Sequence, residues 1–278
     1  MPGTGTELKA LLKVIQDNDY RIGDHQNHFV LSQEMIAHLG STDPELRDDL
    51  IYDIIAHWIE ADLLDAGQLK QILDVCQGSS HLFYRIGESG TDSVFTRSFS
   101  LLVSALVINA HRRHAFLSSS ELQAVKSRIE DYLSRERDLR GYVDGKGWAH
   151  AVAHAADVLG ELAQCPSITD PAEMLAMLAA IKGRMETNDY AYIHEEDERM
   201  VSAVVHIMER KILPDQAIAR WIESFPETRK IGKYPDDLYL RANVKAFLRS
   251  LYLRLSKIDD AAPMLVSLRE KLNKVSRF

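Results

Sequence analysis

Polar side chains recur at helical spacing in the segment that follows Trp148. Four of them are separated by four, three and four positions: His150, His154, Asp157 and Glu161. At about 3.6 residues per turn, this spacing places all four on one narrow stripe of a helix. Two histidines four residues apart can share one metal ion, and an aspartate one turn later can supply a third ligand or orient an imidazole. His150, His154 and Asp157 are therefore candidate ligands of a divalent metal ion.

The residues around this stripe favour a groove over a protease site. A zinc protease of this type needs a glutamate directly after its first histidine as general base, and this chain has Ala151 there. The stripe is surrounded by small side chains: Ala149, Ala151, Ala153, Ala155, Ala156 and Ala163. Because so many alanines let neighbouring helices approach closely, we expect the stripe to line an enclosed cleft. A metal-free groove for a polar ligand is the preferred hypothesis, with a metal site and an ordinary hydrogen-bonded stripe as alternatives.

A second cluster of charged residues, HEEDER at positions 194–199, begins a later helix. Acidic residues are common in the first turn because the helix macrodipole is positive there, and Glu195 with Arg199 makes an ordinary i,i+4 pair. In a superhelix, however, corresponding ends of successive inner helices lie side by side. On that basis we expect Glu195, Glu198 or Arg199 to face the histidine stripe, where carboxylates would serve as metal ligands or acid–base partners.

Three further residues complete the predicted ligand-binding set. Arg97 lies in an otherwise apolar helix with Phe99, so we expect it to meet a carboxylate or a ligand anion, a structural salt bridge being the commoner outcome. Tyr142 lies within the glycine-dense loop at residues 141–147, and Trp148 follows it. The glycines of this loop either leave backbone N–H groups for an anion or only turn the chain. Aromatic residues ahead of the helices either frame a cleft or pack over helix ends.

Helices must position these residues, because helical periodicity runs through almost the whole chain and no alternating strand pattern is present. Start signals are clear at several points: Ser118 with Glu121 is a capping-box pattern, and Asp170 precedes a proline at a first helical position. Twelve helices are expected to start near Gly5, Asn27, Pro44, Ala66, Asp92, Ser119, Trp148, Pro171, Glu195, Asp215, Asp236 and Asp260. The fold class is therefore all-α.

The order of the helices predicts how they pack. Apolar helices alternate with helices that carry one narrow apolar stripe, and the more enclosed ones begin 41 to 56 residues apart. This alternation indicates an irregular, HEAT-like α/α superhelix of antiparallel helix pairs, with one set of helices lining a concave side. A compact bundle and an α/α toroid stay open, since the units share no sequence motif. With no linker or low-complexity tract, residues 1–278 are treated as a single domain.

Composition limits the classes of function. The formal charge of −8 counts against nucleic acid and anionic membranes, because phosphate binding needs a concentrated excess of Lys and Arg. The longest apolar run, residues 99–110, is far shorter than the roughly 20 residues that span a bilayer, and the N-terminus carries no secretory signal. The two cysteines show no paired spacing. These features predict a cytoplasmic protein, and none of them indicates an oligomeric state.

Several motifs resemble those of a bacterial family known as domain of unknown function 2785. They are RGY at residues 140–142, GWAH at 147–150, AH at 153–154 with Asp157, and EDER at 196–199; RSFS at 97–100 is similar to a further element. The resemblance covers most of the chain. It implies an uncharacterised family, and it carries over no activity, cofactor or catalytic residue.

Three functional hypotheses follow from the sequence. The first is a helical-repeat protein that binds a small polar or peptide ligand in a concave groove lined by the stripe at residues 150–161 and the cluster at 195–199. The second is a metal-dependent hydrolase with His150 and His154 as ligands, Asp157 or Glu198 as third ligand or base, and Arg97 or Arg199 on substrate anions. The third is a protein-interaction scaffold.

Overall fold

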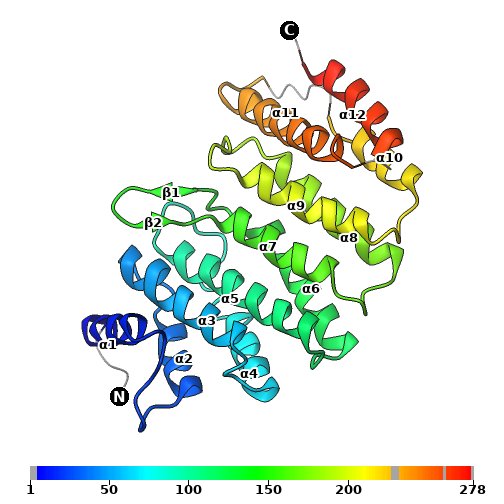
Figure 1. Cartoon of the computed structure of the whole chain (residues 1–278). Helices are drawn as coiled ribbons and strands as arrows, with labels where there is room; N and C mark the ends of the chain where they lie inside the picture. The colour runs from blue at the N-terminus through cyan, green and yellow to red at the C-terminus, as the bar shows by residue number, and fades with distance from the viewer. Residues whose placement is uncertain (1–4, 227–231, 259–260, 277–278) are drawn as a thin grey trace.

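The computed structural model of the chain describes residues 5–226, 232–258 and 261–276. It is all-α apart from one small hairpin (Figure 1). The helices are α1 (Gly5–Asp17), α2 (His28–Ala37), α3 (Asp53–Glu60), α4 (Ala66–Cys76), α5 (Ser93–Arg113), α6 (Ser119–Arg135), α7 (Ala151–Ala163), α8 (Pro171–Met185), α9 (Glu196–Glu209), α10 (Asp215–Glu223), α11 (Asp236–Leu255) and α12 (Ala262–Val275). A π-helical segment, η1 (Glu45–Tyr52), runs directly into α3.

Local capping explains where several of these helices begin. Ser118 and Asp65 each form a complete capping box, with Glu121 and Gln68 as the third helical residue. Asp170 accepts a hydrogen bond at the start of α8. The predicted helix starts agree with the structure to within one residue except at two places. The start near Asp260 lies outside the described residues, and the start at Trp148 is wrong by three residues.

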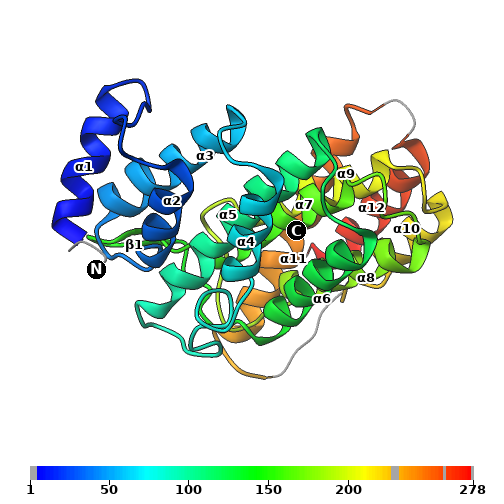
Figure 2. The ribbon, with the colours of Figure 1, turned by 90° about the horizontal axis from the view of Figure 1, so that it is seen from below.

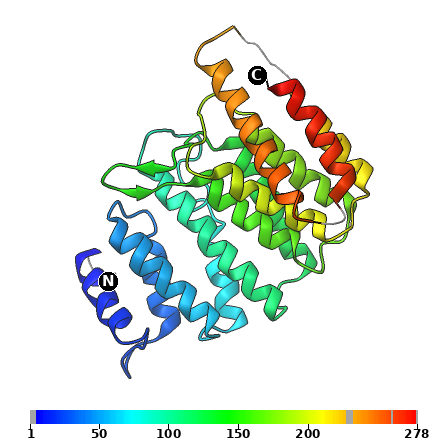
Figure 3. The ribbon, with the colours of Figure 1, turned by 45° about the horizontal axis from the view of Figure 1, so that its top comes forward.

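The error at Trp148 has a structural cause. The helix begins only at Ala151, because His150 is held in the left-handed conformation at φ 45°. The residues before it form an antiparallel hairpin of β1 (Tyr142–Val143) and β2 (Gly147–Trp148), which the sequence did not predict. Figure 3 shows this hairpin at the edge of the molecule, beyond the start of α7.

The longer helices pack in two rows. In one row α3, α5, α7, α9 and α11 lie side by side in chain order, and α4, α6 and α8 cover α5, α7 and α9 from the other side (Figures 1 and 2). The first row is called the inner row below. This arrangement of successive antiparallel helices agrees with the predicted packing, whereas the HEAT-like superhelical geometry stays a prediction.

Small side chains bring the central helices of the inner row together. Ala151, Ala153, Ala155 and Ala156 of α7 are at most 1% exposed, and α7 packs closely on both α5 and α9. Within the described part of the chain, α5 is the one helix long and apolar enough to cross a membrane, but 78% of its apolar window is buried inside the protein. This burial is typical of a core helix.

Candidate functional site

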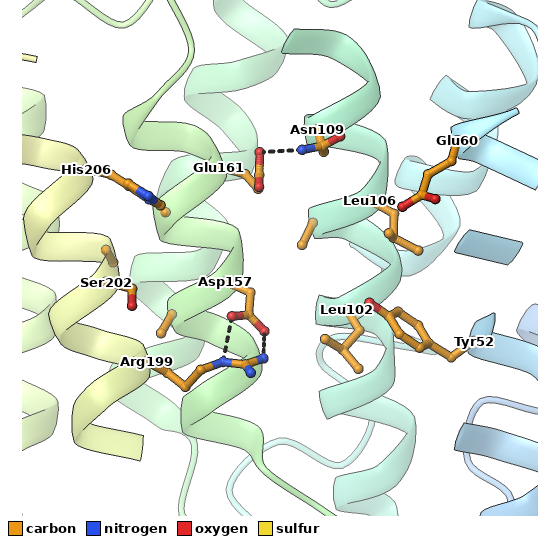
Figure 4. A pocket seen from close by; sticks show the side chains of 14 residues that line it. Tyr52, Glu60, Leu102, Leu106, Asn109, Asp157, Glu161, Arg199, Ser202 and His206 are labelled. Carbon is orange, nitrogen blue, oxygen red and sulfur yellow. Dashed lines mark hydrogen bonds and ion pairs between the residues drawn. The ribbon is translucent and has the colours of Figure 1, made fainter. Parts of the chain in front are cut away.

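A groove of about 400 Å³ opens on the inner row, between α3 and α9. Figure 4 shows its floor on α5, with Leu102 and Leu106 between the side chains of the two walls. The lining residues on the helices are Tyr52, Glu60, Leu102, Ala105, Leu106, Asn109, Ala156, Asp157, Gly160, Glu161, Arg199, Ser202, Ala203 and His206. The groove thus combines apolar residues on its floor with polar and charged residues around them, which suits a small polar ligand.

An ion pair between α7 and α9 forms part of one wall. Arg199 donates through Nε to Asp157 Oδ1 at 2.9 Å and through Nη2 to Oδ2 at 2.5 Å. Burial raises the pKa of the Asp157 carboxyl, and the bidentate bond to Arg199 only partly opposes that effect. The two residues, both predicted ligand-binding residues, are thus brought together on the groove.

Glu161 lies one turn further along α7 on the same wall. Its Oε2 accepts a hydrogen bond from Arg112 at 2.5 Å and another from Asn109 at 3.2 Å. Glu161 belongs to the helical stripe that was predicted from the sequence, but it was not among the predicted ligand-binding residues. Tyr52 and Glu60 were missed, because nothing in the sequence relates η1 and α3 to the surface of α5.

The two histidines of the predicted stripe do not line this groove. His154 is buried between α5 and α7, where its Nδ1 lies 3.1 Å from the Ser98 carbonyl oxygen and its ring meets Phe99 edge to face. Burial holds its pKa well below the ordinary value. His150, His154, Asp157 and Glu198 were predicted to share one groove, and only Asp157 of these four lines the groove described here.

His150 belongs instead to an aromatic cluster at the hairpin. Its ring stacks on Trp148 with centroids 4.3 Å apart, and Trp148 meets His194 and Tyr142 edge to face. Burial, followed by the nearby charge of Arg199, lowers the pKa of His150 to about 4. Trp148 and Tyr142 remain 40% and 50% exposed, so the cluster lies partly at the surface.

The three predicted metal ligands are not arranged as a metal site. The rings of His150 and His154 are 5.7 Å apart at nearly right angles, and both oxygens of Asp157 are held by Arg199. In the described ranges, no group of three or more His, Cys, Asp or Glu side chains is placed to hold a metal ion. The hydrolase hypothesis therefore has no ligand set in this part of the chain.

Arg97 and the acidic residues of α9 also lie away from the groove. Arg97 is fully buried and forms a bidentate ion pair with Glu136, at 2.6 and 2.8 Å. The expectation of a ligand anion at Arg97 is thus replaced by its stated alternative, a structural salt bridge. Glu195 is exposed in a left-handed conformation at φ 65°, just before α9.

The fold and groove define an all-α protein with a polar cleft on one row of helices. Residues 82–253, more than half of the chain, match the family model described as "Protein of unknown function (DUF2785)", and the chain belongs to this family. The matched region includes α5, α7 and α9, which carry most of the groove, but neither η1 nor α3. No curated protein and no solved structure matches the chain.

Proposed function

We propose that this protein binds a small polar ligand or a short peptide in the groove between α3, α5, α7 and α9. The observation that carries the proposal is the hollow of about 400 Å³, with an apolar floor on α5 and the Asp157–Arg199 pair on its wall. This volume falls within the usual range of small-molecule sites. A cytoplasmic location is part of the proposal, since Cys76 and Cys165 are both free, buried thiols.

The electrostatic character of the wall supports a polar occupant. Arg199 is 48% exposed and Asp157 is 25% exposed, so the pair lies at the surface of the groove and is open to a ligand. A guanidinium that already binds one carboxylate still has donors for a second planar acceptor. We also propose the predicted α/α superhelix as the framework, because concave inner surfaces are the usual binding faces of such folds.

Methyl-resolved NMR tests this proposal directly. The protein labelled at alanine and leucine methyls would be titrated with free amino acids, di- and tripeptides, and dicarboxylic acids. We expect the shifts to concentrate at the methyls of the floor, Leu102, Ala105 and Leu106, and at Ala156 and Ala203 on the walls. Replacing Arg199 by Gln is expected to weaken binding about 10- to 100-fold, which is the effect of losing one charged hydrogen bond.

A matched control separates a specific role of Arg199 from a general loss of charge. Arg135 pairs with Asp131 on the outer helix α6 and is 50% exposed, almost the same as Arg199. Arg135→Gln should leave the titrations unchanged. If no ligand moved the groove methyls, or if both variants lost binding equally, the proposal would be wrong; intact partner binding by Arg199→Gln in pull-downs would then favour the scaffold hypothesis.

A further inference from the structure

The two ends of the groove differ in their charged groups. In Figure 4, Asp157, Arg199 and Tyr52 lie at one end, whereas Glu60 and Glu161 lie at the other. The first end is called the arginine end below, and the second is called the glutamate end. A ligand with a separate positive and negative group would complement this arrangement.

Carboxylate oxygens are free at the glutamate end. Arg112 and Asn109 both bind Oε2 of Glu161, and none of the described residues bonds its Oε1. Glu60 is exposed at the end of α3, and its carboxylate likewise has no partner in the described part of the chain. Figure 4 shows Glu60 and Glu161 on opposite sides of α5. An ammonium group has three N–H donors and can bind a free carboxylate oxygen at this end.

One donor is free at the arginine end. Arg199 uses Nε and Nη2 for Asp157, and its Nη1 has no partner among the residues that the structure describes. Each Asp157 oxygen already accepts a bond from this guanidinium, and Nη1 still offers N–H donors on a cation. A carboxylate is the acceptor that suits a guanidinium best.

The distance between the two ends sets the length of the ligand. Arg199 and His206 mark the ends of the groove on α9, seven residues apart, which corresponds to about 10 Å at roughly 1.5 Å per residue. An extended peptide covers about 3.3–3.6 Å per residue, so about three residues cover the same distance. The floor between the ends, with Leu102, Ala105 and Leu106, is apolar and suits side chains better than charges.

We infer that the groove binds a peptide of about three residues through both of its free termini. The α-ammonium group binds at the glutamate end, and the α-carboxylate meets Arg199. This inference rests on the proposed function, since it names the ligand class of the same groove. The termini of the peptide, and not its side chains, are then the main determinants of binding.

Isothermal titration with three forms of one peptide tests the inference. The probes are Ala-Leu-Ala with free termini, its N-acetylated form and its C-amidated form. We expect each blocked form to bind at least tenfold more weakly than the free peptide. Glu60→Gln should weaken binding of the free peptide but not of the acetylated one, and Arg199→Gln should weaken binding of the free peptide but not of the amidated one. Glu270→Gln, on the exposed surface of α12, is the matched control and should change neither value.

The outcomes are distinguishable from a failure of the proposed function. Equal affinity for all three peptides would overturn the inference. It would also be overturned if Glu60→Gln removed the preference for a free C-terminus, or if Arg199→Gln removed the preference for a free N-terminus. If none of the peptides bound, while another ligand shifted the floor methyls, the groove would still be a binding site and the inference would be wrong. If no ligand of any kind shifted those methyls, both would be wrong. Circular dichroism of each variant would establish that it is folded.

Discussion

Arg97 shows how this protein accommodates a charge inside its core. The guanidinium binds both oxygens of Glu136 and also donates to Ser93 Oγ at 2.8 Å and to the Tyr84 carbonyl at 3.1 Å. Glu136 in turn accepts from the backbone N–H groups of the two residues that follow it. Because every part of the pair is bonded, the burial is tolerated, but removing either partner would leave an uncompensated charge.

We therefore expect Glu136→Gln to lower the free energy of unfolding by about 3–5 kcal/mol. Urea denaturation followed by circular dichroism measures this loss. The control is Arg135→Met, which breaks the half-exposed pair with Asp131 and should cost less than about 1 kcal/mol. Equal losses in the two variants would show that the buried Arg97–Glu136 pair contributes no more to the free energy of unfolding than a half-exposed pair does.

His150 should make stability depend on pH. Its pKa in the folded chain is about 4, against an ordinary value of 6.5, because burial and the positive charge of Arg199 disfavour the protonated ring. Well above pH 6.5 the ring is neutral in both the folded and the unfolded chain, so it does not make the free energy of unfolding depend on pH there. As the pH falls from 6.5 to 4, the unfolded chain takes up the proton first, so the free energy of unfolding falls by up to about 1.4 kcal/mol per pH unit.

His150→Asn removes this titration while keeping a residue that tolerates the left-handed conformation. We expect the free energy of unfolding of the variant to fall less steeply than that of the wild type between pH 6.5 and 4. The comparison uses urea midpoints measured at several pH values. Parallel curves for the two proteins would mean that His150 is not a buried neutral ring. His154, with a pKa also well below its ordinary value, continues to titrate in both proteins.

At the scale of elements, most helices could be predicted because their limits are set by residues close in sequence. The capping boxes at Asp65 and Ser118 satisfy backbone groups within a few residues, so pattern alone places α4 and α6. The start of α7 is different, because contacts from distant segments set it. Gly141 lies against His194, where an added Cβ would come within 2.3 Å of Nδ1. Such a contact between loops leaves no periodic signal.

The left-handed residue before α9 gives a prediction for a single element. Glu195 has a φ of 65°, and its side chain is exposed. Since glycine adopts this conformation without the steric penalty of a Cβ, Glu195→Gly should raise the free energy of unfolding by about 0.5–1 kcal/mol. Glu270→Gly, at an exposed position inside α12, should lower it by about 1 kcal/mol. Chemical denaturation of both variants would test the contrast, and a loss at both positions would contradict it.

At the scale of the whole molecule, the candidate site was predictable only in part. Asp157 and Arg199 meet because α7 and α9 are neighbours in the inner row, as the alternation of helices indicated. The other wall comes from η1 and α3, which contact α5 across a long separation in sequence. No periodicity relates Tyr52 or Glu60 to that surface. The groove therefore depends on packing between helices that are distant in sequence, and no sequence pattern indicates this packing.

The same contacts predict that the matched region depends on the residues before it. Arg47 of η1 lies 4.2 Å from the ring centre of Phe95 and 4.6 Å from that of Phe99 on α5, and Trp58 of α3 is fully buried. A chain of residues 82–278 would expose this face of α5, and each large apolar side chain left unburied costs about 1.5–3 kcal/mol. Against a typical free energy of unfolding of about 5–15 kcal/mol, we expect this chain to lose cooperative thermal unfolding and to bind a hydrophobic dye.

A chain of residues 24–278 serves as the control. It lacks α1, which packs on η1, and it should retain a cooperative transition at a lower temperature. Cooperative unfolding of the shorter chain at the full-length temperature would show that the matched region folds independently.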